Sequence, residues 1–452
     1  MKAFALNTAA FAVRALAAIA SLFAGRRRDG LLLISCQGDE PSQDILDLAE
    51  ALRSLPDAQR VAVIASRMRR SIGGAFSFIG KLFSMLRHIA GARVVVIDAY
   101  CMAVSIPKKR PGQKVVQLWH APEAIKKFSL QIVDTPAGYD SRTAKILCMH
   151  RNYDYILCPA DATKPFFAEA FGYPEDVFVK HGLPSLDRIG RMRKPEPYAD
   201  ASSEPGTDET PERLAAREAI YNKYPVLAGS PVIARRREGD EAIHPKEGKR
   251  PLTIVYAPTF RDGIVVDAAG IVGAFANIEN TALVLKLHPL DAEGPSPEPS
   301  PEPSLFLASP DPDLMATAAA GEHKKNRPRY VVDNVFPLLD WYAVADVIIT
   351  DYSGVAIEAA AAGIASYYYI YDIEDYKTRR GLNVDLCDEA IGKYAFTDAG
   401  ELTEQLLNDF SDKCVYDYEA LASFAKKYLE VPLSGNTNKL ADLIVNIHVQ
   451  RF

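Results

Sequence analysis

Short, mostly apolar runs recur along the chain and alternate with stretches of helical periodicity. The runs are Leu31–Ser35, Val61–Ala65, Val94–Asp98, Lys114–Leu118, Ile254–Ala257, Leu283–Leu287, Tyr330–Val332 and Val347–Thr350. Runs of this kind, without strict polar alternation, indicate strands that are buried on both faces. Helical stretches such as Ser42–Leu55 separate them, which is typical of α/β folds with parallel sheets. The sequence therefore predicts two doubly wound, Rossmann-like domains that face one another across a cleft.

The alternation of strand and helix patterns is interrupted in two places, and the first interruption separates the two expected domains. Between residues 192 and 250, prolines and charge runs interrupt the periodicity, apart from one helical piece near Glu212–Tyr224. The second break, at 294–304, is proline-rich and acidic, and we expect it to form a surface loop. We therefore expect an N-terminal domain over 29–191, a linker with charged insertions over 192–250, and a C-terminal domain over 251–452.

The first quarter of the chain is basic, although the whole protein carries a net charge of −6. Residues 1–130 hold 19 Lys and Arg against 9 Asp and Glu, whereas the remainder holds 33 against 49. This asymmetry predicts an anionic partner for the first quarter alone. Because no nucleic-acid-binding motif accompanies the charge, we expect an anionic membrane surface rather than nucleic acid.

Two segments of this quarter combine apolar residues with cations. Residues 1–28 are apolar and alanine-rich, are interrupted by Asn7 and Arg14, and end in three consecutive arginines. The interruptions disfavour a spanning helix, and the small-residue cleavage pattern of a signal peptide is missing. The pattern favours a helix that lies at the membrane interface, and the alternative is a first helix packed on its own domain.

The second segment is an amphipathic helix expected over residues 67–90. Its apolar stripe consists of Ile72, Phe76, Ile79, Phe83, Leu86 and Ala90, and it is flanked by Arg67, Arg69, Arg70, Lys81, Arg87 and His88. Such a stripe is attracted to anionic lipid, although the same pattern is also found on helices that face a core. We expect the stripe to be exposed or to lie beside basic surface, and the two segments together favour peripheral, monotopic attachment.

The six cysteines are scattered, with neither a CxxC pair nor a Cys/His cluster. This distribution argues against a disulfide framework or a zinc site and is typical of a reducing compartment. A GxxxxGK[ST] loop and a paired acidic metal motif are also absent from the sequence, so a P-loop nucleotidase is disfavoured. We expect no cofactor and no bound metal.

Two histidines follow predicted strands, where the carboxyl ends of parallel strands usually place binding sites. His120 comes after the strand at 114–118, and His288 comes after the strand at 283–287. A histidine there can take a proton from an attacking hydroxyl, whereas a single histidine more often packs against backbone. Because each expected domain contributes one, we predict one histidine near the acceptor hydroxyl and the other near the departing phosphate.

Two further strand ends carry groups suited to phosphate. Thr259 and Arg261 follow the strand at 254–257, and an arginine fork binds either phosphate or a nearby carboxylate. The strand at 347–350 leads through Thr350, Asp351, Tyr352, Ser353 and Gly354 into a predicted helix. The N-terminus of that helix can hold a diphosphate or can simply be capped by Ser353. Glu358, one turn further, can reach a ribose hydroxyl.

In this order, the segments resemble the CDP-glycerol glycerophosphotransferase family of wall teichoic acid synthesis, which includes teichoic acid polymerases and primases. The shared motifs are Trp119-His120, Tyr256–Asp262, His288-Pro289, Thr350–Ser353 and the spacing of Tyr376 to Arg380-Gly381. The resemblance covers residues 90–385. The chain departs from the family after Trp-His, where Ala121-Pro122-Glu123 replaces the frequent Gly-Thr-Pro, and at Ser185, where an arginine is usual.

The resemblance implies a GT-B-like domain pair and an activity. Glycerol phosphate, or another polyol phosphate, would pass from a CDP-polyol donor to a hydroxyl of a lipid-linked acceptor or growing teichoic-acid-like polymer, with release of CMP. His120 would be the base, and His288 would stabilise the transferred or leaving phosphate. Arg380 and the segment Thr350–Gly354 would bind the donor phosphates. The protein would act peripherally at the cytoplasmic face of the plasma membrane.

Two other functions remain open from the residues. A GT-B glycosyltransferase with a nucleotide-sugar donor is the first, because Glu358 and Ala359 followed by Gly363 also resemble the donor helix of those enzymes. A non-catalytic membrane scaffold is the second, and the two strand-terminal histidines and Arg380 argue against it. The sequence leaves open the identity of the polyol, the acceptor, the choice between primase and polymerase, and the oligomeric state.

Overall fold

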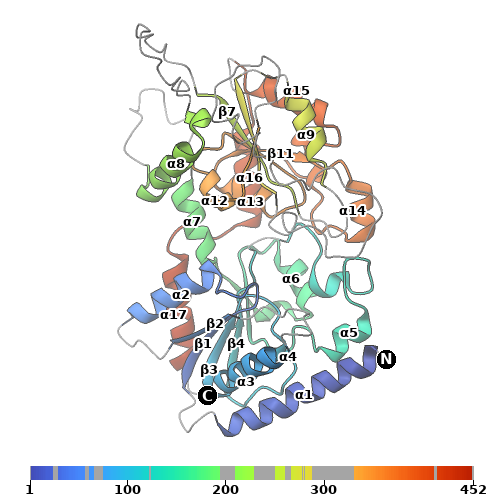
Figure 1. Cartoon of the computed structure of the whole chain (residues 1–452), viewed down its shortest axis with the longest axis vertical. Coiled ribbons are helices and arrows are strands. Elements are labelled where there is room, and N and C mark those ends of the chain that lie inside the picture. The colour runs from blue at the N-terminus through green and yellow to red at the C-terminus, as the bar shows by residue number, and fades with distance from the viewer. Residues whose placement is uncertain are drawn as a thin grey trace. The chain divides into compact units, whose positions relative to one another are not determined.

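The computed structural model of this chain describes residues 2–23, 29–55, 61–65, 75–121, 124–193, 209–228, 250–259, 266–276, 278, 280–287, 330–411 and 415–449. The chain forms two compact units, each with its own sheet (Figure 1). The first unit consists of Met1–Gly190, Glu374–Asp385 and Ala425–Phe452, and the second consists of Arg191–Ile373 and Leu386–Phe424.

The sheet of the first unit has six parallel strands in the order β2-β1-β3-β4-β5-β6. The strands are β1 (Gly30–Ser35), β2 (Val61–Ala65), β3 (Ala92–Ile97), β4 (Lys114–Gln117), β5 (Tyr155–Cys158) and β6 (Phe178–Lys180). The chain first winds from β1 to β2 and then returns to the other side of β1. The winding direction therefore reverses between β1 and β3, the place where ligands bind in open parallel sheets.

Helices cover both faces of this sheet. Leu31, Leu33, Val94 and Val96 face a core shared with α2 (Gln43–Ser54) and α17 (Asn436–Val449). The alternate residues of β1 and β3 face a second core, to which α1 (Lys2–Leu22), α3 (Ala75–Gly91), α4 (Met102–Ser105) and α6 (Lys164–Phe171) contribute. Because side chains alternate along a strand, continuously apolar strands are required for a sheet covered in this way.

The second unit also has six parallel strands, in the order β12-β11-β10-β7-β8-β9. They are β7 (Leu252–Tyr256), β8 (Thr281–Leu285), β9 (Tyr330–Val332), β10 (Val347–Thr350), β11 (Ala365–Tyr369) and β12 (Ala395–Phe396). Here the winding direction reverses between β7 and β10. Its described helices include α8 (Pro211–Lys223), α9 (Ala268–Phe275), α12 (Leu338–Trp341), α13 (Val355–Ala361) and α15 (Ala399–Asp409).

The remaining described α-helices are α5 (Ser141–Ile146), α7 (Pro184–Met192), α14 (Ile373–Arg379) and α16 (Tyr418–Tyr428). The α/β fold with two parallel sheets is confirmed, and each strand predicted from an apolar run is present. The helix expected near residues 212–224 is α8. The strands β5, β6, β11 and β12 were not predicted. The loop at 294–304 lies outside the described residues, as does most of the linker.

The apolar stripe expected on the second basic segment is only partly exposed. The side chains of Ile72 and Phe76 lie outside the described part of the chain. On α3, Ile79 is 47% exposed and Phe83 is half-buried, but Leu86 is 2% exposed and belongs to the core under the sheet. The prediction of an exposed stripe is therefore wrong for Leu86, because this part of α3 packs on the sheet.

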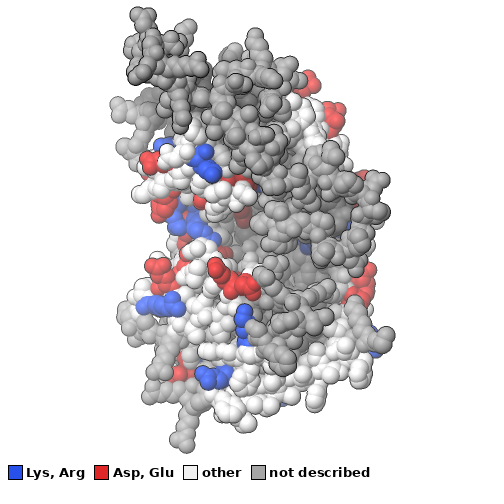
Figure 2. Space-filling model, in the orientation of Figure 1, with Lys and Arg blue, Asp and Glu red and all other residues white. Residues whose placement is uncertain are grey.

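α1 buries one side and exposes the other. Ala10, Val13 and Ala20 are buried where α1 runs beside α3 and α5 (Figure 1), whereas Phe4 is 80% and Phe11 is 70% exposed. Figure 2 shows a largely uncharged surface along this helix. By length and composition alone, α1 is the one helix among the described residues that is suited to cross a membrane.

Candidate active site

The strand ends of the first unit are organised by Asp98, which follows β3 and is fully buried. Its carboxylate accepts four hydrogen bonds, from Ser35 Oγ at 2.6 Å, Cys36 N at 2.9 Å, Gln37 Nε2 at 3.0 Å and Ser42 Oγ at 2.8 Å. A buried carboxylate has lost its hydration, and several hydrogen-bond donors are needed to compensate for that loss. These contacts hold the loop between β1 and α2 at the place where the winding direction of the chain reverses.

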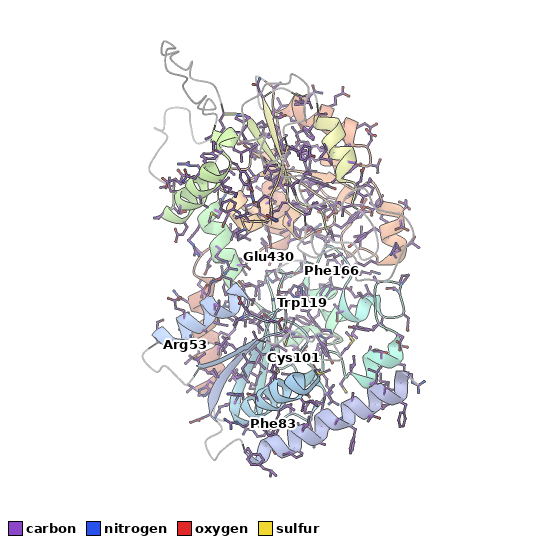
Figure 3. The ribbon with its side chains drawn as sticks, viewed as in Figure 1. Arg53, Phe83, Cys101, Trp119, Phe166 and Glu430 are labelled. Carbon is purple, nitrogen blue, oxygen red and sulfur yellow. The ribbon has the colours of Figure 1, made fainter. Side chains whose placement is uncertain are left out.

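His120 lies at the end of the next strand, β4. The side-chain oxygen of Gln117 accepts a hydrogen bond of 2.8 Å from the backbone N–H of Trp119, which adopts a φ of 60°. Few residues other than glycine adopt this left-handed conformation, and it is enriched at functional sites. The turn packs the His120 ring against the Trp119 ring at an interplanar angle of 39°, with centroids 4.1 Å apart. Trp119 in turn lies beside α6 (Figure 3).

The His120 ring also faces the backbone of Asp98, directly after β3, and this contact favours the charged form of the ring. His120 is nevertheless exposed to solvent. Desolvation by the surrounding protein lowers the pKa of His120 below 6.5, and the charge of Lys126 lowers it further, against the opposing influence of Asp98. The imidazole is therefore neutral at neutral pH, the form that can accept a proton from a substrate.

Arg380 belongs to the same unit as His120. Residues near His120 pair with the segment after α14, through a bridge between Lys126 and Leu382 and a 3.1 Å hydrogen bond from Lys127 N to Gly381 O. Arg380 Nε donates to the carbonyl of Lys127 at 2.9 Å. This bond orients the guanidinium, and no hydrogen bond to its two terminal nitrogens is seen within the described residues.

In the second unit, Thr259 and Asp351 meet where the winding of the sheet reverses. The buried carboxylate of Asp351 accepts hydrogen bonds from Thr259 N at 3.0 Å and from Thr259 Oγ1 at 2.6 Å. The hydroxyl of Thr350 donates to the carbonyl of Ala257 at 2.7 Å. These side chains hold the ends of β7 and β10 together, and they shape this end of the sheet.

Ser353, Gly354 and Glu358 lie at the start of α13, directly after β10. Gly354 is the residue before the helix, and the N–H of Glu358 donates to its carbonyl at 3.1 Å. Ser353 Oγ accepts a long hydrogen bond of 3.4 Å from Val355 N. The arrangement matches the strand–turn–helix expected from the sequence, whereas the binding of a diphosphate to it stays a prediction.

Arg261 and His288 lie outside the described residues. The structure therefore places His120 and Arg380 in the first unit, and places Thr259, Thr350, Asp351, Ser353, Gly354 and Glu358 in the second. The pairing of His120 with His288 stays a prediction. Across the described part of the chain, no group of three His, Cys, Asp or Glu side chains is arranged to hold a metal ion.

Sequence reasoning missed two features of the first unit. From the sequence, Asp98 is only the last residue of a predicted strand. An acidic residue at the end of an apolar run is the signal that could have identified it as a buried acceptor. His150 was not considered, although it forms the aromatic layer behind Trp119, with ring centroids 6.4 Å apart. It hydrogen-bonds Ser129 Oγ and lies 3.2 Å from the Tyr153 hydroxyl, and burial lowers its pKa to about 3.

Comparison with known proteins gives consistent results. The model of the family described as CDP-Glycerol:Poly(glycerophosphate) glycerophosphotransferase matches residues 17–207 and 237–446. The chain is 25% identical to a teichoic acid ribitol-phosphate primase of Bacillus spizizenii, over 92% of this chain and 91% of that protein. It is 21% identical to a teichoic acid glycerol-phosphate primase of Bacillus subtilis, over 79% and 74%. The solved wall teichoic acid polymerase TagF has the same fold, with a TM-score of 0.64 at 15% identity, over 99% of this chain and 98% of that one.

Proposed function

The chain belongs to the CDP-glycerol:poly(glycerophosphate) glycerophosphotransferase family, and from this we propose that it transfers a polyol phosphate from a CDP-polyol to an acceptor hydroxyl and releases CMP. The observation that carries the proposal is His120, neutral and partly open to solvent at the ends of β3 and β4. A neutral imidazole within reach of a substrate hydroxyl can accept its proton. The acceptor that we propose is a lipid-linked teichoic-acid-type polyol phosphate or its primer.

The reaction that we propose is a single displacement at phosphorus. The acceptor oxygen forms a bond to the phosphorus that carries the polyol, and the bond from that phosphorus to the bridging oxygen breaks, so the electron pair leaves with CMP. His120 takes the hydroxyl proton on an unprotonated ring nitrogen. Arg380 and the turn before α13 would bind the donor phosphates, and His288 would stabilise the departing phosphate.

Release of nucleotide tests this function directly. The purified protein is incubated with CDP-glycerol, CDP-ribitol or a UDP-sugar, with Bacillus subtilis membranes as the source of acceptor. We expect CMP from at least one CDP-polyol, because the bond between the two donor phosphates breaks in phosphotransfer. A nucleoside diphosphate from the UDP-sugar, without CMP from either CDP-polyol, would instead indicate a glycosyltransferase. Comparison of the two CDP-polyols identifies the transferred unit.

We further propose that the protein attaches peripherally to the cytoplasmic face of the membrane through α1. The helix packs one side on α3 and α5, so its outer side can lie in the interface while the inner side stays bound to the unit. Phe4, Phe11 and Leu22 are exposed on that outer side, and Arg26–Arg28 follow the helix in the sequence. An apolar surface close to arginines is suited to anionic lipid.

Replacing Phe4, Phe11 and Leu22 together by serine should release the protein from vesicles. Each large apolar side chain contributes about 1.5–3 kcal/mol when it is fully buried, so we expect partitioning to fall by more than about tenfold. Co-sedimentation with phosphatidylglycerol vesicles at low and high salt measures it. The control replaces Val332 and Val335, which are exposed apolar residues of the second unit, by serine. If the α1 variant and the control variant bind the vesicles equally well, attachment through α1 is contradicted.

A further inference from the structure

An open groove of about 610 Å³ lies in the first unit, between residues 130–133, α5 and the last turn of α6. This volume is within the range of small-molecule sites. Leu130, Val133, Met149 and Phe171 supply apolar surface, and Lys145 and Arg151 supply positive charge. No Asp or Glu is among the described residues that line the groove. The groove is therefore apolar and cationic at once.

The two cations differ in how they are held. Arg151 Nε donates to the carbonyl of Ser105 at 3.0 Å, and its Nη2 donates to the carbonyls of Ile106 and Pro107. These carbonyls fix the guanidinium without neutralising it, since no carboxylate in the described chain pairs with it. Lys145 is exposed on α5.

The two acids that most closely precede Lys145 in the sequence make hydrogen bonds at the start of α5. Asp134 accepts a hydrogen bond from Ser141 N at 2.8 Å, and Asp140 caps α5 by accepting from Thr143 N and Thr143 Oγ1, each at 2.8 Å. Both carboxylates therefore stabilise the start of α5. Within the described residues neither Lys145 nor Arg151 forms an ion pair with a carboxylate, so the positive charge of the groove is available to an anion from outside.

The backbone around the groove adopts unusual conformations. Five of the seven non-glycine residues with positive φ in the described chain lie between residues 129 and 152, and they are Ser129, Asp134, Cys148, His150 and Asn152. Left-handed conformations away from glycine cost energy, and they gather where ligands bind. Cys148 and His150 both line the groove. The strain therefore lies in the wall of the groove itself.

The groove adjoins two features already described. On one side, Arg14 of α1 contacts Cys148 Sγ at 3.7 Å, so the exposed apolar helix runs beside the groove. On the other side, Phe171 packs on Trp119 with ring centroids 5.2 Å apart, and Trp119 packs against His120. Phe171, in the wall of the groove, and Trp119 thus lie between the groove and His120.

We propose that this groove binds a lipid phosphate, with the phosphate against Lys145 and Arg151 and the apolar chain along Leu130, Val133 and Met149 towards α1. This inference rests on the proposed function, in which it gives the acceptor its site: the lipid end is held at the membrane side while the acceptor hydroxyl reaches His120. An apolar lining with convergent cations is complementary to an amphiphile with an anionic head.

Titration with short-chain lipids tests the groove apart from catalysis. The probe is dihexanoyl phosphatidic acid, compared with dihexanoyl phosphatidylcholine and with glycerol 3-phosphate, and isothermal titration calorimetry measures the binding. We expect phosphatidic acid to bind best, since it combines the chain with an unshielded phosphate. Lys145→Glu should weaken its binding by about tenfold or more, because a like charge then faces the phosphate.

Lys439→Glu, at an exposed position on α17 of the same unit, is the matched control and should bind phosphatidic acid like the unaltered protein. Lys145→Ala is the milder variant, and thermal unfolding verifies that each variant folds. If Lys145→Glu and Lys145→Ala bind phosphatidic acid as tightly as the unaltered protein does, the groove proposal is overturned. Equally tight binding of glycerol 3-phosphate would also overturn it, in favour of a soluble phosphate.

The failure of this inference can be told apart from failure of the proposed function. If the unaltered protein releases CMP from a CDP-polyol while Lys145→Glu keeps the KM for membrane acceptor, the function stands and the groove proposal falls. If phosphatidic acid binds in a Lys145-dependent way but no CDP-polyol yields CMP, the groove stands and the function falls.

Discussion

Replacing His120 by alanine is expected to lower turnover by roughly 10²–10⁴-fold, the usual contribution of a general base. The ring packs against Trp119, and desolvation by the surrounding protein together with the charge of Lys126 lowers its pKa. Donor affinity should change little, because removing a base affects the transition state more than the ground state. CMP release under saturating donor measures turnover, and equilibrium binding of the CDP-polyol measures affinity.

The control for this variant is His88→Ala. His88 lies on α3 of the same unit and contacts the carbonyl of Ser84 at 2.8 Å, just before the amino-terminal end of β3 and therefore away from the carboxyl ends of the strands. It should retain full turnover. If the His120 variant also retains full turnover, then His120 is a packed structural histidine and the base is another group.

The pH dependence of turnover gives a second test of His120. A base must be neutral to accept a proton, so turnover should rise with pH through the pKa of His120 and then level off. Because desolvation and Lys126 lower that pKa, the midpoint of the rise should lie below pH 6.5. Lys126→Gln removes a positive charge near the ring and should move the midpoint to higher pH.

Replacing Asp98 by alanine is the second change with a large expected effect. It leaves four donors from the loop between β1 and α2 without their acceptor. Each buried donor left unpaired costs about 1–3 kcal/mol, and water can satisfy some of them, so we expect the free energy of unfolding to fall by about 3 kcal/mol or more. Turnover should fall as well, because loss of these side-chain bonds releases the loop between β1 and α2 and shifts the end of β3, whose backbone faces His120.

Asp154→Ala is the matched control for Asp98. Asp154 accepts hydrogen bonds from Lys109 Nζ at 2.6 Å and from Val115 N at 2.8 Å, at the opposite, amino-terminal ends of β4 and β5. Its loss should lower the free energy of unfolding in urea while leaving turnover and its pH midpoint unchanged. If both variants lose turnover only in proportion to the unfolded fraction, Asp98 has no positioning role beyond stability.

The sequence predicted much of the fold because burial on both faces imposes a pattern that can be read locally. A strand such as Val94–Asp98 has no polar face to offer to water, so it must be covered by helices on both sides. The strands that escaped prediction are short or unusual: β12 has two residues, and β11 carries three consecutive tyrosines. The motifs around His120 and Thr350 were likewise legible, because each directly follows a strand.

Other properties depend on residues far apart in the chain, and only the tertiary structure decided them. Asp98 accepts several hydrogen bonds because the fold brings Ser35 and Ser42, from another strand and the loop after it, next to its carboxylate. Arg380 belongs to the unit of His120 because the segment after α14 pairs with Lys126 and Lys127.

The two basic apolar segments also show which properties the sequence determines and which only the tertiary structure decides. Helical periodicity determined that each has an apolar side, but an apolar side can face lipid or the protein core with the same pattern. Packing decided between them: Leu86 of α3 entered the core beneath the sheet, whereas Phe4 and Phe11 of α1 stayed exposed. The pattern sets which residues avoid water, whereas the neighbouring layers, assembled from distant parts of the chain, decide what shields them from it.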